Sequence, residues 1–125
     1  MKVFTINEAN DLLPGVRLRI SRLKKIHSYL REQRSAAQGA AANAVRGGGG
    51  MKDGGRYVAR LLEFSEITSE FDELGIQIKD IERGLIDFPA WRDDRIVLLC
   101  WQLGEGDEIE WWHDVDSGFA GRQPL

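Results

Sequence analysis

Cysteine and histidine, the residues of most metal and redox sites, are scarce in this chain. It has one cysteine and two histidines, with no Cys-x-x-Cys pair and no His-x-x-x-His pair. One cysteine cannot form an internal disulfide, which fits a reducing compartment. No apolar run approaches the ~20 residues of a membrane-spanning helix, and residues 1–5 lack the apolar core of a signal peptide. The sequence therefore predicts a cytoplasmic protein without a membrane partner.

Positive charge is scarce in the second part of the chain and negative charge in the first. Residues 1–46 carry nine Lys and Arg against three Asp and Glu, and residues 47–125 carry eight against seventeen. A basic segment can bind nucleic acid, but the acidic remainder would repel phosphates, and no aromatic side chains are interleaved with the basic ones. We expect the basic segment to pack beside the acidic one, with a nucleic-acid contact as the less favoured alternative.

The composition of the chain predicts one folded domain over residues 1–125. Hydrophobic residues make up 42% of the chain and charged residues 30%, which is typical of globular proteins. A length of 125 residues is near the common size for a single hydrophobic core.

The first part of the chain carries the signals of two antiparallel helices. Thr5 and Glu8 are spaced as a capping box, which predicts a helix start. We expect one helix within residues 1–46, with a kink or a restart at Pro14, then a flexible glycine-rich connector over residues 47–55 and a second helix over residues 56–74. Apolar positions recur every three or four residues. They are Ala9, Leu12, Leu13, Val16, Ile20, Leu23, Ile26 and Leu30, then Tyr57, Leu61, Phe64 and Phe71.

Residues 75–115 change to the period of two that is typical of strands. Short turns between them predict a four-stranded antiparallel meander, with a second strand that ends at Pro89 and a fourth strand over residues 108–115. The third strand is apolar on both faces, so both faces need a cover. One face would take the helices, and the other would take either the C-terminal tail, with Phe119 folded back, or a second copy of the protein. We favour a homodimer.

His113 lies in the predicted fourth strand, on the face of Ile109, Trp111 and Val115. The favoured interpretation is a histidine at the edge of the core that is bonded to a backbone carbonyl. The alternative is a ligand or an acid–base group, because histidine titrates near neutral pH.

A metal site is the sharpest chemical hypothesis for this region. It would combine His113 and Asp116 with Asp80 or Asp87 on neighbouring strands, and nitrogen with carboxylate ligands suits zinc, manganese or iron. Solvated carboxylates are the favoured alternative, so no cofactor is predicted. Cys100 lies in the most apolar strand and is interpreted as a buried structural thiol.

The tail, residues 116–125, carries one guanidinium between two glycines and a proline. Arg122 is expected to pair with a carboxylate such as Asp87 or Asp116, and a bound anion is the alternative. If the pairing is internal, the tail acts as a structural lock on the sheet.

Four motifs together resemble a bacterial family of unknown function, domain of unknown function 2203. They are FTxxEANxLLP at residues 4–14, GLIDFPA at 84–90, LCW at 99–101 and WHxVDxGFAGRQP at 112–124. The resemblance covers nearly the whole chain. It implies a small cytoplasmic bacterial protein, and it implies no activity.

The sequence therefore predicts an α+β fold with an N-terminal helical hairpin, a four-stranded meander and an ordered tail. The favoured function is a non-enzymatic interaction or oligomerisation module whose protein partner, apart from a second copy, is unknown. The alternative is a small metal- or anion-binding protein or enzyme with a polar site at one end of the sheet. That site would be lined by Asp80, Asp87, His113, Asp116 and Arg122.

Overall fold

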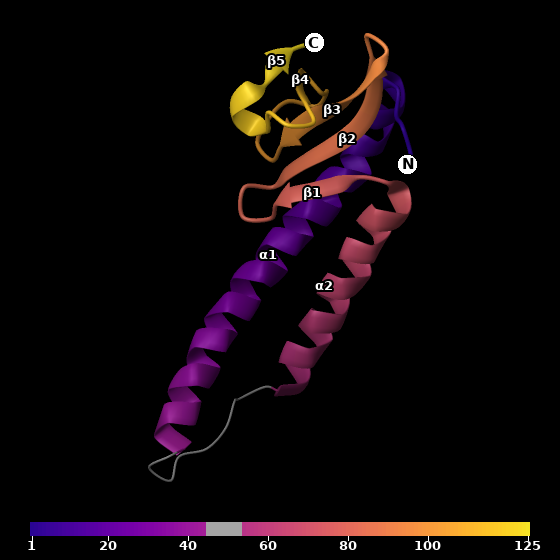
Figure 1. The fold of residues 1–125 in the computed structure, drawn as a ribbon. Helices are drawn as coiled ribbons and strands as arrows, with labels where there is room; N and C mark the ends of the chain where they lie inside the picture. Colours follow the sequence, from indigo (N-terminus) through magenta and orange to yellow (C-terminus); the bar gives the residue numbers. More distant parts are fainter. Residues whose placement is uncertain (45–53) are drawn as a thin grey trace.

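Two long helices are followed by an antiparallel sheet, so the predicted α+β class is confirmed (Figure 1). The computed structural model describes residues 1–44 and 54–125. The helices are α1 (Ile6–Ala44) and α2 (Gly54–Leu74), and a short 3-10 helix η1 (Phe119–Gly121) lies in the tail. The strands are β1 (Gln77–Asp80), β2 (Leu85–Arg92), β3 (Arg95–Gln102), β4 (Trp111–Asp114) and β5 (Gln123–Pro124).

The predicted start of α1 is confirmed in detail. The Thr5 amide donates to Glu8 Oε1 at 3.0 Å, and the Glu8 amide donates to Thr5 Oγ1 at 3.0 Å. The hydrogen bond from the Thr5 backbone amide to the Glu8 carboxylate is the main cause that holds the pKa of Glu8 below its usual value. The residue before the cap, Phe4, is buried and meets the Phe88 ring edge-on, so the cap also fixes where the chain enters the core.

Helix α1 runs through Pro14 as one α-helix, so the predicted restart at this residue is wrong. A proline inside a helix removes one backbone donor. Pro14 itself is exposed, while its neighbours Leu13 and Val16 are fully buried against the sheet. The packing of this segment holds it helical despite the lost hydrogen bond.

The connector predicted for residues 47–55 needs one correction. Gly54 and Gly55 belong to the first turn of α2, and residues 47–53 lie outside the described residues. The stop predicted at Gly75 is confirmed. Gly75 has φ +83°, and the Ile76 amide donates to the Phe71 carbonyl at 3.0 Å, which closes the last turn of α2.

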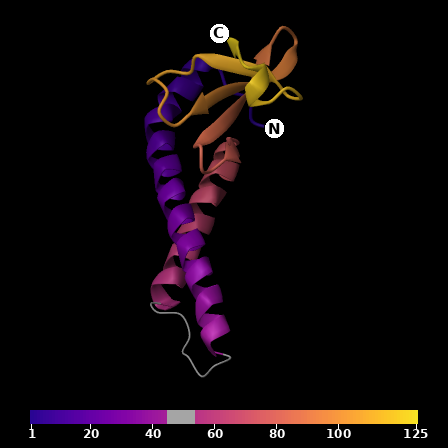
Figure 2. The same cartoon turned by 90° about the vertical axis from the view of Figure 1, so that its left-hand side faces the viewer.

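The two helices bury very different amounts of their apolar faces. The predicted stripe of α1 is confirmed, since all of its members from Ala9 to Leu30 except the half-buried Leu12 are buried. In α2 only Phe71 is buried. Figures 1 and 2 give the reason: the sheet lies at one end of the helical pair, and the far ends of both helices extend away from it. We call this extension, residues 24–44 and 54–66, the helical arm.

The sheet has five antiparallel strands in the order β1-β2-β3-β4-β5, one more than predicted. The additional strand comes from the tail, where Gln123 pairs with Trp112 and Pro124 with Trp111. The predicted fourth strand over residues 108–115 is shortened to Trp111–Asp114. The tail therefore forms the edge of the sheet instead of lying loosely over one face.

Strand β2 continues through Pro89 to Arg92, although the sequence predicted an end at the proline. The Pro89 carbonyl accepts the Phe4 amide at 2.7 Å, on the side away from β3. A residue in a strand points its amide and carbonyl to the same side, so the donor that Pro89 lacks would not have bonded to β3. The ladder between β2 and β3 is therefore complete despite the proline.

Alternation along the strands gives the sheet two faces. The face toward α1 contributes Phe88, Leu99 and Trp112 to the main core. Sequence reasoning placed Trp112 on the polar face and Ile109 on the face of His113. In the structure Trp112 and Ile109 both belong to the main core, because Ile109 precedes β4 and lies outside its alternation. His113 faces the opposite side.

Candidate functional site

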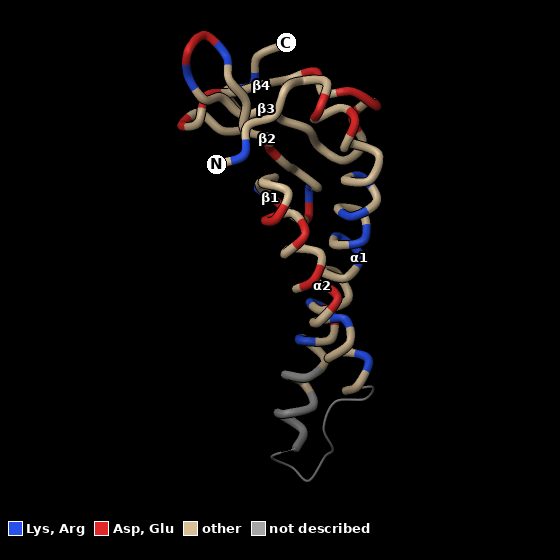
Figure 3. The backbone as a smooth tube through the Cα atoms, turned by 90° about the vertical axis from the view of Figure 1, so that its right-hand side faces the viewer, with Lys and Arg blue, Asp and Glu red and all other residues tan. Residues whose placement is uncertain are grey.

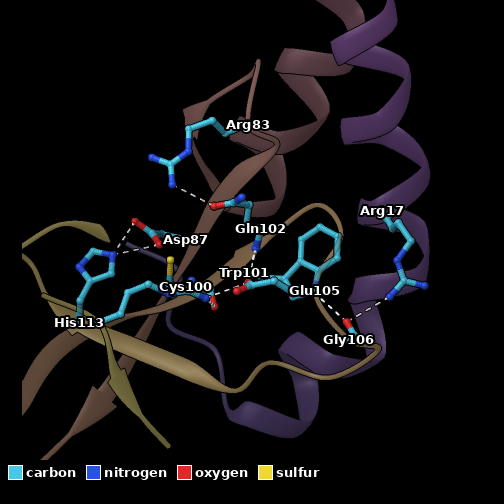
Figure 4. A network of polar contacts seen from close by, with 10 residues as sticks. Arg17, Arg83, Asp87, Cys100, Trp101, Gln102, Glu105, Gly106 and His113 are labelled. Atoms are coloured by element: carbon cyan, nitrogen blue, oxygen red, sulfur yellow. Dashed lines mark hydrogen bonds and ion pairs between the residues drawn. The ribbon is translucent and has the colours of Figure 1, made fainter. Parts of the chain in front are cut away.

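Three polar side chains lie together on the face of the sheet that points away from α1. Asp87 of β2 is directly opposite Cys100 of β3, and His113 of β4 is diagonal to Cys100. One ligand-type atom from each lies within 4.8 Å of the other two, and all three residues are buried. Figure 4 shows the His113 ring and the Cys100 sulfur beside the Asp87 carboxylate. We call these three residues the polar trio.

The His113 ring is held at both nitrogens. Nδ1 lies 2.8 Å from the Asp114 carbonyl oxygen, and Nε2 lies 3.1 Å from each carboxylate oxygen of Asp87. A carbonyl oxygen only accepts hydrogen bonds, so the geometry assigns a proton to Nδ1. Nε2 then faces two more acceptors, and a second proton or another positive charge has to lie between Nε2 and the carboxylate. The predicted bond from His113 to a backbone carbonyl is present, alongside a charged partner that was not predicted for it.

Cys100 is the member of the polar trio that sequence reasoning left out of the site. It was interpreted as a buried structural thiol, and it is fully buried. Burial raises its pKa to about 12, with a further contribution from the charge of Asp87. Without a bound cation the side chain is a neutral thiol at physiological pH, so it is not a nucleophile. The sequence alone does not show that Cys100 lies opposite Asp87, because this depends on the register between β2 and β3.

Arg122 pairs with Glu105 rather than with Asp87 or Asp116. Its Nη2 donates to Glu105 Oε1 at 2.8 Å and lies 3.5 Å from the Cys100 carbonyl oxygen. The guanidinium stacks on Trp111 and Phe119, at 5.1 Å and 4.6 Å from the ring centroids. Phe119 therefore folds back toward the sheet, as predicted for the tail. This contact supports the prediction that Arg122 locks the tail in place.

The turn that carries Glu105 is held by both the sheet and α1 (Figure 4). Glu105 Oε1 also accepts the Gln102 amide at 2.7 Å. The neighbouring Gly106 carbonyl accepts the Trp101 indole at 2.9 Å and Arg17 of α1 at 3.4 Å. Helix α1 thus fixes the turn, and the turn fixes the tail through Arg122.

The remaining predicted site residues lie outside the polar trio. Asp80 is the half-buried last residue of β1, and its Oδ1 accepts the Arg83 amide of the following turn at 3.1 Å. Asp116 is exposed after the end of β4. Of the predicted set, the structure brings Asp87 and His113 together, whereas Arg122 is bonded to Glu105 and to the Cys100 carbonyl.

The family match covers the polar trio, the turn and the tail. The family model described as uncharacterized conserved protein (DUF2203) matches residues 2–125. The chain belongs to this family. No curated protein and no solved structure matches the chain significantly. The family description names no activity, so function has to be argued from the contacts themselves.

Neither helix, over its described residues, contains a stretch long and apolar enough to cross a membrane.

Proposed function

We propose that this protein is a non-enzymatic module that associates with a second copy of itself through the helical arm. The observation that carries the proposal is an apolar stripe on α2 formed by Val58, Leu61 and Leu62, which are 52%, 41% and 67% exposed. Their i, i+3 and i+4 spacing places them on one face of the helix. Single exposed apolar residues are ordinary on protein surfaces, but a contiguous group marks an interaction site.

In the helical arm, α1 buries Ile26 and Leu30, but the apolar face of α2 is largely uncovered. Beyond the sheet each helix has only the other helix as a partner, and the apolar side chains of α2 there, such as Phe64, are half-buried at most. Most helical stability in proteins comes from burial of an apolar face. A second arm packed on the stripe of α2 would make a four-helix arrangement in which these faces are covered.

The charges of the arm favour a second copy over an unrelated partner. Figure 3 shows Lys and Arg concentrated on α1 and Asp and Glu on α2. Within one chain this complementarity is already used, since Arg22 lies 2.6 Å from Glu63 of the arm, and outside the arm Arg19 lies 2.6 Å from Glu70. A two-fold arrangement would repeat it between chains, with α1 of each copy facing α2 of the other.

Further charges on the arm are available for such contacts. Lys24 and Lys25 on α1 are exposed and form no ion pair with another described residue, and the same is true of Glu66 on α2. The lysines and the glutamate have opposite sign and lie on different helices.

Burial of the polar trio supports a non-enzymatic role over the alternative of an enzyme with a polar site. Asp87, Cys100 and His113 expose 2% of their surface or less, so a substrate could not reach them in this conformation. Arg122, the candidate anion ligand, is engaged by Glu105.

The test is the solution mass of the protein, measured by light scattering after gel filtration. The wild type is expected at twice the chain mass of 14.1 kDa. Leu62→Glu is expected to elute at the monomer mass, because it places a charge in the apolar contact. Leu18→Glu is the matched control, since Leu18 is 75% exposed on α1 and lies among polar neighbours.

Two results would overturn this proposal. A wild type that stays monomeric at ~100 µM would exclude a self-association stable enough to matter, because a micromolar Kd is already a weak complex. A dimer that survives Leu62→Glu but dissociates on Trp91→Ala would place the interface at the tip of the β2–β3 hairpin, where Trp91 is 67% exposed.

A further inference from the structure

We propose that the polar trio binds one zinc ion, through His113 Nε2, Cys100 Sγ and a carboxylate oxygen of Asp87. This inference concerns the sheet and is independent of association through the helical arm. Zinc accepts all three of these ligand types. The soft thiolate favours zinc over magnesium, calcium or manganese, which prefer oxygen ligands.

The distances within the polar trio fit a small cation. The three ligand atoms lie within 4.8 Å of one another. Bonds of 2.0–2.3 Å in a tetrahedral arrangement place the ligand atoms of zinc ~3.3–3.8 Å apart. The widest of these separations would have to shorten by about 1 Å, which side-chain rotation can supply while the paired strands that carry the ligands stay in place. The fourth position of the tetrahedron is left for a water molecule or another donor.

The orientation of His113 is the one that a metal ligand requires. A histidine that binds a metal through one nitrogen usually donates the other N–H to a carbonyl or carboxylate, which fixes the tautomer and the ring. Here Nδ1 donates to the Asp114 carbonyl at 2.8 Å, so Nε2 is the nitrogen left to bind a metal, and it faces Asp87. A lone pair and a carboxylate 3.1 Å apart repel each other unless a positive charge lies between them.

The charges of a zinc complex would balance within the buried site. In the absence of metal, the arrangement holds a protonated His113, an ionised Asp87 and a neutral thiol, which sum to zero. Zinc would displace the thiol proton of Cys100 and the Nε2 proton of His113, and both protons would leave to solvent. The divalent ion is then neutralised by one thiolate and one carboxylate. A buried complex without net charge avoids the large cost of placing an isolated ion in the interior.

The surroundings supply the remaining support. Arg122, whose Nη2 lies 3.5 Å from the Cys100 carbonyl oxygen, is itself neutralised by Glu105 at 2.8 Å, so it does not repel a metal as a free charge would. The strands that carry the three ligands are paired to one another in one sheet, and such rigid elements hold ligand geometry better than loops do.

The single cysteine allows a test in the unmodified protein. We would prepare metal-free full-length protein with a chelator, add Co²⁺ during refolding and record the absorption spectrum. Ligation by Cys100 is expected to give a thiolate-to-cobalt charge-transfer band in the near ultraviolet, with one equivalent of cobalt at saturation. Since no other thiol is present, the band assigns the ligand without a mutation.

Zinc itself provides the second readout. Protein refolded with Zn²⁺ and dialysed is expected to retain one zinc per chain by mass spectrometry, and binding is expected to release about two protons. Cys100→Ser and His113→Asn should lose the metal, and His27→Asn should keep it, because His27 lies on α1 outside the polar trio. Circular dichroism establishes that each variant is folded.

The proposal is overturned if the wild type shows no charge-transfer band and retains less than a tenth of an equivalent of zinc. In that case a proton occupies the space between His113 and Asp87. It is also overturned if His27→Asn loses the metal while Cys100→Ser keeps it. Self-association is tested independently by the solution mass of the metal-free protein. A failure to bind zinc would leave that mass unchanged, because the two proposals concern different surfaces.

Discussion

His113 Nε2 lies 3.1 Å from both oxygens of Asp87, and both side chains are almost completely buried. The two residues come from β4 and β2, which are not neighbours in the sheet, and β3 lies between them. The pair therefore reaches across a whole strand. Its contact ties β4 to β2 through side chains, in addition to the backbone ladders that each strand forms with β3.

Removal of the imidazole should lower the stability of the fold strongly. His113→Ala leaves the Asp87 carboxylate buried without its partner, and we expect a loss of about 3–5 kcal/mol in the free energy of unfolding. The measurement is urea unfolding of chelator-treated protein. The double variant Asp87→Ala with His113→Ala should lose less than the sum of the two single variants, because it leaves no buried charge. A loss below about 1 kcal/mol for His113→Ala would contradict the pairing.

Removal of the Arg122 side chain should loosen the tail. Arg122→Ala deletes the bond to Glu105 and the stacking on Trp111 and Phe119, and we expect a loss of about 2 kcal/mol. Thermal unfolding provides the measurement. Arg34→Ala is the matched control, because Arg34 is exposed on α1. If Arg122→Ala shows the same melting temperature and the same solution mass as the wild type, the tail lock is wrong.

The ion pair between Arg22 and Glu63 predicts a pH dependence with a definite sign. The hydrogen bond from Arg22 holds the pKa of Glu63 below its usual value. A carboxylate with a depressed pKa in the folded state stabilises the fold above its unfolded pKa of ~4.3, and this stabilisation is lost as pH falls through the folded value.

Glu63→Gln should therefore be less stable than the wild type at pH 7, and the difference should shrink as the pH falls from 5 to 3. The measurement is the urea midpoint at each pH, and Glu32→Gln on the exposed side of α1 serves as the control. A difference that stays constant across this range would show that the pair contributes nothing through its charge.

The local features of the fold could be predicted from the sequence because each depends on residues close together in the chain. The capping box of Thr5 and Glu8 and the stop at Gly75 need only a few neighbouring residues. The buried stripe of α1 follows from its helical period. Strand alternation correctly predicted that His113 and Trp112 lie on opposite faces of the sheet. Which of the two faces meets α1 depends on packing, and there the prediction failed, because Trp112 belongs to the main core and not to the polar face.

The features that the sequence did not predict depend on contacts between distant segments. β5 exists only because the tail returns to Trp111 and Trp112, and two residues carry no strand signal of their own. The pairing of Arg122 with Glu105 depends on where the turn after β3 is held. Asp87 and His113 were both named as candidates, whereas the inclusion of Cys100 needed the register of β2 against β3.

The consecutive order of the strands has a consequence for how the chain folds. Every strand lies beside the strand that precedes it in sequence, so the sheet can grow hairpin by hairpin with short loop closures. The contacts that span the chain are those of α1, such as Phe4 with Pro89 and Asn10 with the Ile109 amide. Because long-range closure slows folding, we expect docking of α1 onto a nearly finished sheet to be the step that sets the folding rate.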